Sequence, residues 1–384
     1  MSNSSVQHRR WLLAVYAVGV AVATLQRGVW SREHTTFAIF RQSFLHLFRH
    51  QNLYAAYPLE QGTAAADLFK YSPSAAMLFA PLAAVPYPVA LLGWNLLNAG
   101  LLVYAVTRLL PPRRANLALL LLAPEVFVAV QSSSSNALIA GLLLLAAFAY
   151  EEGRLLRAGG ALAVGAAIKI FPVAALIFGM MHVYRRRALL AAAVVFAAVL
   201  ALPLLVIGPA ELLEQYRWWA TLQARDARDL MFGLSLMPQF RHWWEVRWPN
   251  WPVQAVGTVL FLLPILLRRD RWRSRAFRFE YLCSLLIYVV LFNHQAERQS
   301  FVIAATGAVL WYVTTEPTRE RSLLLALALI GVPTFPYLAL WLVIHAGLLR
   351  REGEAESEAP RTMSMARDRM TLRRRWPASW RKAS

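Results

Sequence analysis

The chain has 384 residues, of which 58% are hydrophobic and only 16% are charged. Because soluble domains carry about 25% charged residues, this composition excludes an ordinary soluble protein. The formal net charge of +19 at pH 7 would suit nucleic-acid binding in a soluble chain. Here most Arg residues lie in short segments between apolar runs, which is the positive-inside pattern, and we expect no nucleic acid as a partner. We predict an all-α fold, a polytopic membrane helix bundle in the cell inner (plasma) membrane.

The first apolar run covers residues 11–30. No small-residue cleavage site follows it cleanly, so we predict a retained helix rather than a signal peptide. Residues 31–73 are too polar to span a bilayer and form a predicted first outer loop. Within it, FAIFRQSFLHLF places Phe, Ile and Leu at helical spacing among Arg41 and other polar residues. This pattern predicts an amphipathic helix that lies in the membrane interface.

The later apolar runs differ in length. The long runs are 90–108, 189–207 and 279–292. The runs 117–130 and 137–150 would each form about 21 Å of helix, whereas a hydrocarbon core is about 30 Å thick. The runs 158–168 and 173–184 are shorter still. We interpret the short runs as half-helices buried within the protein, with 74–85 as a re-entrant piece. In the alternative topology each is a short full span, and some Arg-rich loops lie outside the cytoplasm.

If every Arg-rich loop is cytoplasmic, several polar segments share the opposite face of the membrane. These segments are 31–73, 131–136, 169–172, 208–251 and 293–298. We expect a transmembrane domain over residues 1–350. The remainder, 351–384, is predicted to be a disordered basic cytoplasmic tail near anionic lipid headgroups.

Two of these segments interrupt short apolar runs. Lys169 stands inside GAAIKIFPVAALIF, and a charged side chain at membrane depth is a functional hypothesis by default. It is either a cation that pairs with a phosphate or a Lys that snorkels from a helix end. In QSSSSN, Gln131 and Asn136 would line a polar cavity, or the segment is an ordinary capped turn.

Two further segments combine charged and polar residues. NHQAER contains Asn293, His294 and Glu297 between two apolar runs. It is either part of a site, in which Asn293 would line the polar cavity, or a charged loop tip. DLFKYSP contains Asp67 and Lys70 just before a Pro that suits the first turn of a helix. This segment would place both charges at the membrane surface, where a substrate that is part lipid and part phosphate could enter.

The sequence lacks the usual motifs of metal and nucleotide sites. It has one cysteine and no CxxC pair, no HExxH and no Gly-rich phosphate loop. We therefore predict no bound metal and no cofactor.

Several blocks together resemble glycosyltransferase family 87, membrane enzymes of the GT-C fold that includes polyprenol-phosphate-mannose-dependent mannosyltransferases. The blocks are FAIFRQSFLHLFRHQNLYAAYP, FKYSPSAAMLFAPLAAVPYPVALLGWNLLN, SNALIAGLLLLAAF, AGGALAVGAAIKIFPVAALIFG and NHQAERQSFVIAATGAVLWY. The resemblance implies a GT-C-like helix bundle with a metal-independent site on the non-cytoplasmic face. It also implies a polyprenyl-phosphate sugar donor, a lipid or glycan acceptor, and contact with membrane lipids.

The resemblance also implies that a carboxylate of the first outer loop acts as general base on the acceptor hydroxyl. The family typically carries an Asp just before F-x-x-[YF], and here Thr36 stands in that place. The candidates for the base are then Glu33, which we rank first, Asp67 and Glu297. The candidates for binding the donor phosphate are Lys70, Lys169 and His294, with Arg41 behind them.

We therefore expect a membrane glycosyltransferase that moves a hexose, mannose first among them, from a polyprenyl-phosphate sugar to a lipid or glycan acceptor. One alternative is a polytopic transporter of a lipid-linked or small anionic substrate, which should show paired halves with internal symmetry. A non-catalytic divergent family member is the other alternative.

Overall fold

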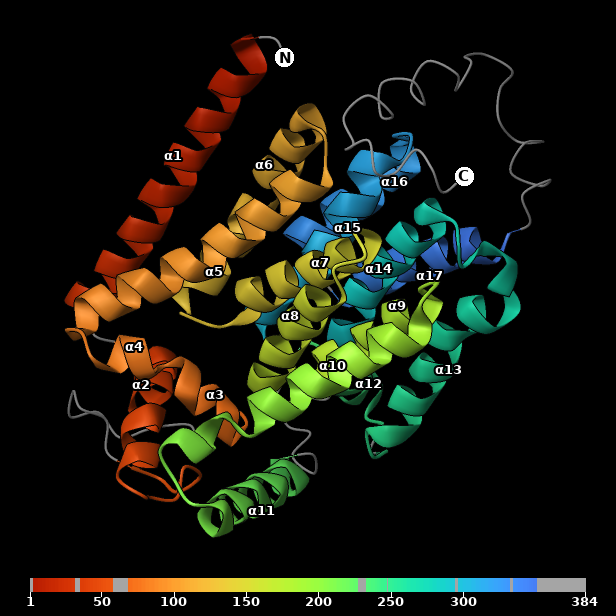
Figure 1. Cartoon of the computed structure of the whole chain (residues 1–384). Coiled ribbons are helices and arrows are strands. Elements are labelled where there is room, and N and C mark those ends of the chain that lie inside the picture. The colour runs from red at the N-terminus through yellow and green to blue at the C-terminus, as the bar shows by residue number, and fades with distance from the viewer. Residues whose placement is uncertain are drawn as a thin grey trace. The chain divides into compact units, whose positions relative to one another are not determined.

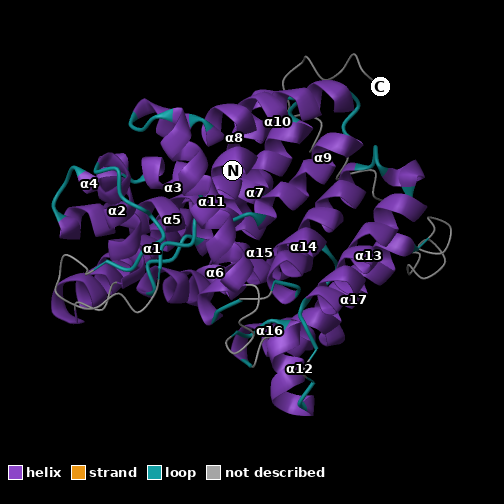
Figure 2. Cartoon of the chain, turned by 90° about the horizontal axis from the view of Figure 1, so that it is seen from below, coloured by secondary structure: helices purple, strands orange, loops and turns teal. Residues whose placement is uncertain are grey.

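A computed structural model describes residues 3–31, 35–57, 68–226, 233–246, 248–293, 296–331 and 334–350 (Figure 1). All regular elements in these residues are helices, which confirms the predicted all-α polytopic bundle (Figure 2). Residues 1–348 form one compact unit. The predicted tail, and the candidate residues Glu33, Asp67 and His294, lie outside the described residues.

The N-terminal half contains nine of the α-helices described. They are α1 (Asn3–Leu25), α2 (Thr35–Phe48), α3 (Pro73–Leu78), α4 (Ala80–Ala83), α5 (Tyr87–Leu109), α6 (Pro112–Gln131), α7 (Asn136–Glu151), α8 (Leu155–Ile168) and α9 (Leu176–Met181). A 3-10 turn over Phe171–Ala175 connects α8 to α9.

The C-terminal half continues the bundle. Its described helices are α10 (Arg185–Leu200), α11 (Pro209–Asp226), α12 (Leu236–Trp244), α13 (Trp251–Leu267), α14 (Arg275–Leu291), α15 (Phe301–Thr314), α16 (Arg319–Ile330) and α17 (Thr334–Leu349). Side-chain caps begin two of them: Ser274 accepts a hydrogen bond from the backbone of Phe277, and Thr318 accepts one from Arg321.

Among the described residues, three helical segments are long and apolar enough to cross a membrane, namely Gln7–Gly28, Tyr87–Leu109 and Pro112–Gln131. The helix that contains the run 117–130 is therefore longer than the sequence pattern indicated. It begins at Pro112 and includes two Arg residues. Exposed apolar side chains on the first of these segments and on other helices, such as Val18, Leu190 and Val256, fit a surface that faces lipid.

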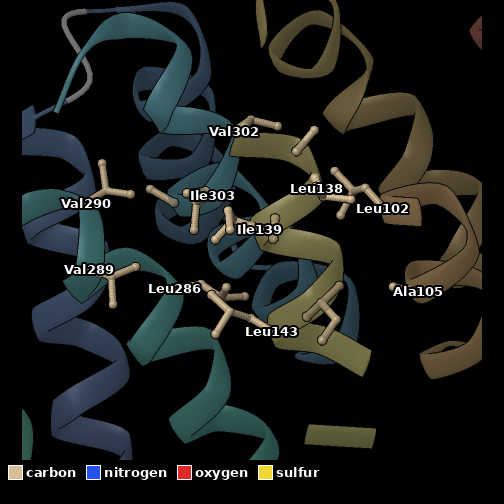
Figure 3. Close-up of a cluster of buried hydrophobic side chains, with 14 of the residues drawn as sticks. Leu102, Ala105, Leu138, Ile139, Leu143, Leu286, Val289, Val290, Val302 and Ile303 are labelled. Carbon is tan, nitrogen blue, oxygen red and sulfur yellow. The ribbon is translucent and has the colours of Figure 1, made fainter. Parts of the chain in front are cut away.

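The buried core lies around α7. Figure 3 shows Ile139 and Leu143 of α7 between α5, represented by Leu102 and Ala105, and α14, represented by Leu286. These side chains are fully buried. Burial of this kind contributes roughly 1.5–3 kcal/mol per large side chain in water. In a membrane most of the gain comes from close packing instead.

One end of the bundle gathers arginines and acidic partners, and we call it the basic end. There Arg108 at the end of α5 lies 3.9 Å from Glu152, and Arg154 lies 3.1 Å from the same carboxylate. Arg278 near the start of α14 donates to both oxygens of Glu151, at 2.5 and 2.8 Å. The ends of α5 and α7 and the starts of α8 and α14 therefore meet.

The short helices connect this basic end to the other end of the bundle. α8 runs without interruption between its flanking residues Arg154 and Lys169, although it holds only 14 residues. Its small residues allow close packing, since a Cβ added at Gly159 would lie 3.0 Å from the Cα of Ala192 in α10. α7 and α8 thus each connect the two ends of the bundle, and both are shorter than the segments that are long enough to cross a membrane. The choice between half-helices and short full spans stays a prediction.

Candidate functional site

Lys169 and Asn136 meet at the end of the bundle opposite the basic end. Lys169 follows the last residue of α8, and its side chain is half-buried. The Nζ atom donates a hydrogen bond of 2.7 Å to Oδ1 of Asn136, which opens α7 and is buried. Pro172, three residues on, has no N–H to continue a regular helix, and the chain passes instead into a 3-10 turn. Two candidate segments are therefore joined by one hydrogen bond.

The QSSSSN segment is held in place by α5. The indole Nε1 of Trp94 donates to the carbonyl of Ser133 at 2.8 Å, and Oδ1 of Asn98 accepts from the backbone N–H of Leu138 at 3.2 Å. The Asn136 amide also donates to Ser134 Oγ at 3.2 Å. These bonds orient the Asn136 carbonyl oxygen toward Lys169.

Gln131 does not take part in this arrangement. It is the last residue of α6 and is exposed. Its role as a lining residue of a polar cavity stays a prediction.

The FKYSP segment lies beside the end of α8. Both the backbone N–H and the hydroxyl of Ser72 donate to the carbonyl of Ala167, at 3.1 and 2.8 Å. The Tyr71 hydroxyl lies 3.2 Å from Ser135 Oγ. Tyr71 therefore links this segment to the turn that carries Asn136, and Lys70 stands one residue before it.

A further helix, α11, positions Lys70. Its residues Trp219 and Gln223 donate side-chain hydrogen bonds of 3.0 and 2.7 Å to the Lys70 carbonyl. From the same helix, the Tyr216 hydroxyl lies 2.9 Å from Ser74 Oγ. This role could not be predicted, because nothing in residues 208–226 marks a partner about 150 positions earlier.

Burial disfavours the charged form of Lys169, and the nearby carboxylate of Glu297 offsets part of that effect. The carboxylate is exposed and accepts a hydrogen bond from Gln299. Within the described ranges no carboxylate lies within 4.0 Å of Lys169 Nζ. Asn293 is half-buried at the end of α14, where its N–H contacts the Val290 carbonyl at 3.4 Å. We call Lys70, Asn136, Lys169 and Glu297 the polar cluster.

Arg41 lies elsewhere. Its guanidinium donates to the carbonyls of Leu82, Ala83 and Val85, at 3.1 to 3.2 Å, and so satisfies the end of α4. The structure does not place it in the polar cluster, and we do not include it in the proposed site.

The helix that carries Arg41, α2, packs its aromatic face against protein. Phe40 contacts the rings of Tyr71, Phe79 and Trp94, with centroid distances of 4.8 to 5.9 Å. The predicted helix of the first loop is thus present, and its apolar face covers α3 and α5. Its position in the membrane interface stays a prediction.

One buried carboxylate near this end was not among the candidates. Glu125 in α6 is only 2% exposed, and its two oxygens accept from Arg298 at 2.5 and 2.7 Å. Glu125 stands directly after Pro124 in an apolar run. A carboxylate in such a run is unusual, and this could have marked Glu125 as a candidate.

A family model described as glycosyltransferase family 87 matches residues 69–293, which is more than half of the chain. The chain belongs to glycosyltransferase family 87. This glycosyltransferase carries Lys70, Asn136 and Lys169 inside the matched region, whereas Glu297 lies just beyond it. A comparison with curated proteins gave no significant match.

The chemistry of the polar cluster suits an anionic ligand. The amide that holds the ammonium group of Lys169 brings no counter-charge, so an anion near that group gains a charge-assisted hydrogen bond. In the part of the chain that the structure describes, no three His, Cys, Asp or Glu side chains group closely enough to hold a metal ion. Metal independence stays a prediction.

Proposed function

We propose that this family 87 glycosyltransferase moves a hexose, with mannose the first sugar to test, from a polyprenyl phosphate to a hydroxyl of a lipid or glycan acceptor. The observation that supports this proposal most strongly is the Lys169 Nζ–Asn136 Oδ1 hydrogen bond of 2.7 Å. It holds a half-buried cation at the end of an apolar helix, where a lipid-linked phosphate can be reached from the bilayer.

The two ends of the bundle support a non-cytoplasmic site in the inner (plasma) membrane. The basic end carries Arg108, Arg154 and Arg278, and arginine-rich loops favour the cytoplasmic side. α7 and α8 each run from the basic end to the polar cluster. The polar cluster therefore faces away from the cytoplasm in this proposal.

In the proposed reaction a carboxylate accepts the proton of the acceptor hydroxyl. The hydroxyl oxygen then bonds to the anomeric carbon of the sugar, and the bond from that carbon to the phosphate oxygen breaks. Polyprenyl phosphate leaves with an added negative charge, which Lys169 and Lys70 stabilise. His294 remains a proposed third cation at this phosphate.

Three carboxylates are proposed as the base. Glu297 has the charge interaction with Lys169, whereas Glu33 and Asp67 lie outside the described residues and rest on the family resemblance. Substitutions Glu33→Gln, Asp67→Asn and Glu297→Gln distinguish them, because removal of the base lowers kcat by about 10²- to 10⁴-fold.

The proposal is tested with purified protein, radiolabelled polyprenyl-phosphate mannose and polyprenyl-phosphate glucose, and a membrane lipid extract as acceptor. Transfer from either donor that is lost in Lys169→Met supports the proposal. Transfer from a nucleotide sugar, with none from either lipid-linked donor, contradicts it.

A further inference from the structure

The Glu125–Arg298 ion pair joins the middle of the chain to the segment that carries Glu297. The two residues are 173 positions apart, and both guanidinium nitrogens Nη1 and Nη2 bond to the carboxylate. A buried carboxylate such as Glu125 is costly unless it is paired and hydrogen-bonded in good geometry. The bidentate geometry fixes the orientation of Arg298 as well as its distance.

A second anchor lies on the other side of Glu297. The carbonyl of Ala296, a fully buried residue, accepts a hydrogen bond of 2.6 Å from the backbone N–H of Leu234. The preceding Gly233 has φ +141°, a conformation that L side chains rarely adopt, and a Cβ there would lie 3.4 Å from the Ala296 carbonyl oxygen. Thr334 donates to the Leu234 carbonyl. Ala296 is therefore fixed by a separate set of contacts.

Glu297 stands in extended backbone between these anchors, with φ −84° and ψ 171°. In extended backbone, successive side chains point to opposite sides. Ala296 is buried and the Arg298 guanidinium bonds to the buried Glu125, whereas the Glu297 carboxylate between them is exposed and accepts a hydrogen bond from Gln299.

We propose that Glu125 and Arg298 are positioning residues, which hold the 296–298 segment and with it the carboxylate of Glu297, one of the proposed bases. The inference rests on the proposed function of the polar cluster and adds two residues outside it. Loss of the Glu125 charge frees Arg298 and loosens the segment, and it removes no group that touches the substrate.

The chain offers a matched control at the basic end. Glu151 accepts a bidentate bond from Arg278 with nearly the same distances, 2.5 and 2.8 Å. Glu151→Gln and Glu125→Gln thus remove the same chemistry from opposite ends of the bundle. Arg298→Lys is a milder change at the proposed pair, since Lys keeps the charge but cannot form both hydrogen bonds to the carboxylate in the same geometry.

The test is a double-mutant cycle on the transfer reaction. Glu125→Gln is expected to lower kcat by about tenfold or more with donor KM changed by less than about threefold, and Arg298→Lys by a smaller factor. In a Glu297→Gln background, Glu125→Gln should cost no further activity. The proposal is overturned if Glu125→Gln leaves kcat unchanged, if its cost is equal in both backgrounds, or if Glu151→Gln costs as much.

A second measurement is independent of turnover. Amide exchange of peptides covering 296–300 reports the hydrogen bond of 2.9 Å from Ser300 N–H to the Glu297 carbonyl. Exchange there should be faster in Glu125→Gln and Arg298→Lys than in wild type or Glu151→Gln. Unchanged exchange in Glu125→Gln overturns the positioning role even if transfer is observed. Faster exchange with no transfer by wild type from any lipid-linked donor rejects the proposed function alone.

Discussion

Lys169 and Asn136 are 33 positions apart, and the Nζ of one donates a 2.7 Å hydrogen bond to the Oδ1 of the other. Each stands where a short helix meets a turn: Lys169 follows α8, and Asn136 opens α7. Both helices reach the basic end at their other termini. A charged residue that looks isolated within an apolar sequence is therefore part of a cluster at one end of the bundle.

Asn136→Asp should weaken donor binding. The new carboxylate would form an ion pair with Lys169 and compete with the donor phosphate for its charge. We expect the donor KM to rise by about tenfold or more, equivalent to about 1.4 kcal/mol. Gln131→Glu, five residues earlier on an exposed position, is the control and should change KM by less than about twofold. Steady-state kinetics at varied donor concentration measure both, and an unchanged KM in Asn136→Asp would contradict the role of Lys169.

Loss of the hydrogen bonds from α11 to the Lys70 carbonyl should also raise the donor KM. Trp219→Phe and Gln223→Leu each remove one of them. A hydrogen bond of this kind contributes about 0.5–1.5 kcal/mol, so each change should raise KM about two- to tenfold. Trp243→Phe is the control, because that indole bonds to Gln239 within its own helix. Equal effects of all three substitutions would show that Lys70 is not positioned by α11.

Gly159→Leu should destabilise the protein. The added side chain meets the backbone of Ala191 and Ala192 in α10, and overpacking of this kind costs about 1–3 kcal/mol. Gly160→Leu is the matched control, since a Cβ at Gly160 meets nothing within 4 Å. Thermal unfolding in detergent measures the difference. A lower midpoint for Gly160→Leu than for Gly159→Leu would mean that α8 and α10 do not pack as described.

Labelling at the two ends of α6 tests the orientation of the polar cluster. The one cysteine, Cys283, is buried, and Cys283→Ala gives a background without a reactive thiol. Gln131→Cys should react with a membrane-impermeant maleimide added to intact cells, whereas Arg113→Cys should react only after the cells are opened. The reverse pattern would place the polar cluster in the cytoplasm.

Much of this arrangement could be predicted from the sequence. Polar and charged side chains cost free energy at membrane depth, so the few that interrupt apolar runs stand out as candidates. Lys169, Asn136 and the FKYSP segment were all found in this way, and the positive-inside pattern indicated that they share a face. The all-α membrane fold could be predicted from the apolar runs. The start of α6 at Pro112 could not, because two Arg residues belong to the first turn of that helix.

Other contacts could not be predicted because they depend on distant packing. Arg41 is a candidate for the donor phosphate because of its charge, and the sequence does not show that its guanidinium bonds to carbonyls about 40 positions later. The bonds from Trp219 and Gln223 to Lys70, and the pairing of Glu125 with Arg298, join segments whose separation in sequence carries no periodic signal.

The most direct measurement is transfer of radiolabelled sugar from polyprenyl phosphate by wild type, Lys169→Arg and Lys169→Met in liposomes. Removal of a charge that stabilises the leaving phosphate costs about 10²- to 10³-fold in kcat. We predict that loss for Lys169→Met and a partial loss for Lys169→Arg, which keeps the charge but changes its geometry. Equal rates of transfer by wild type and Lys169→Met would contradict the account.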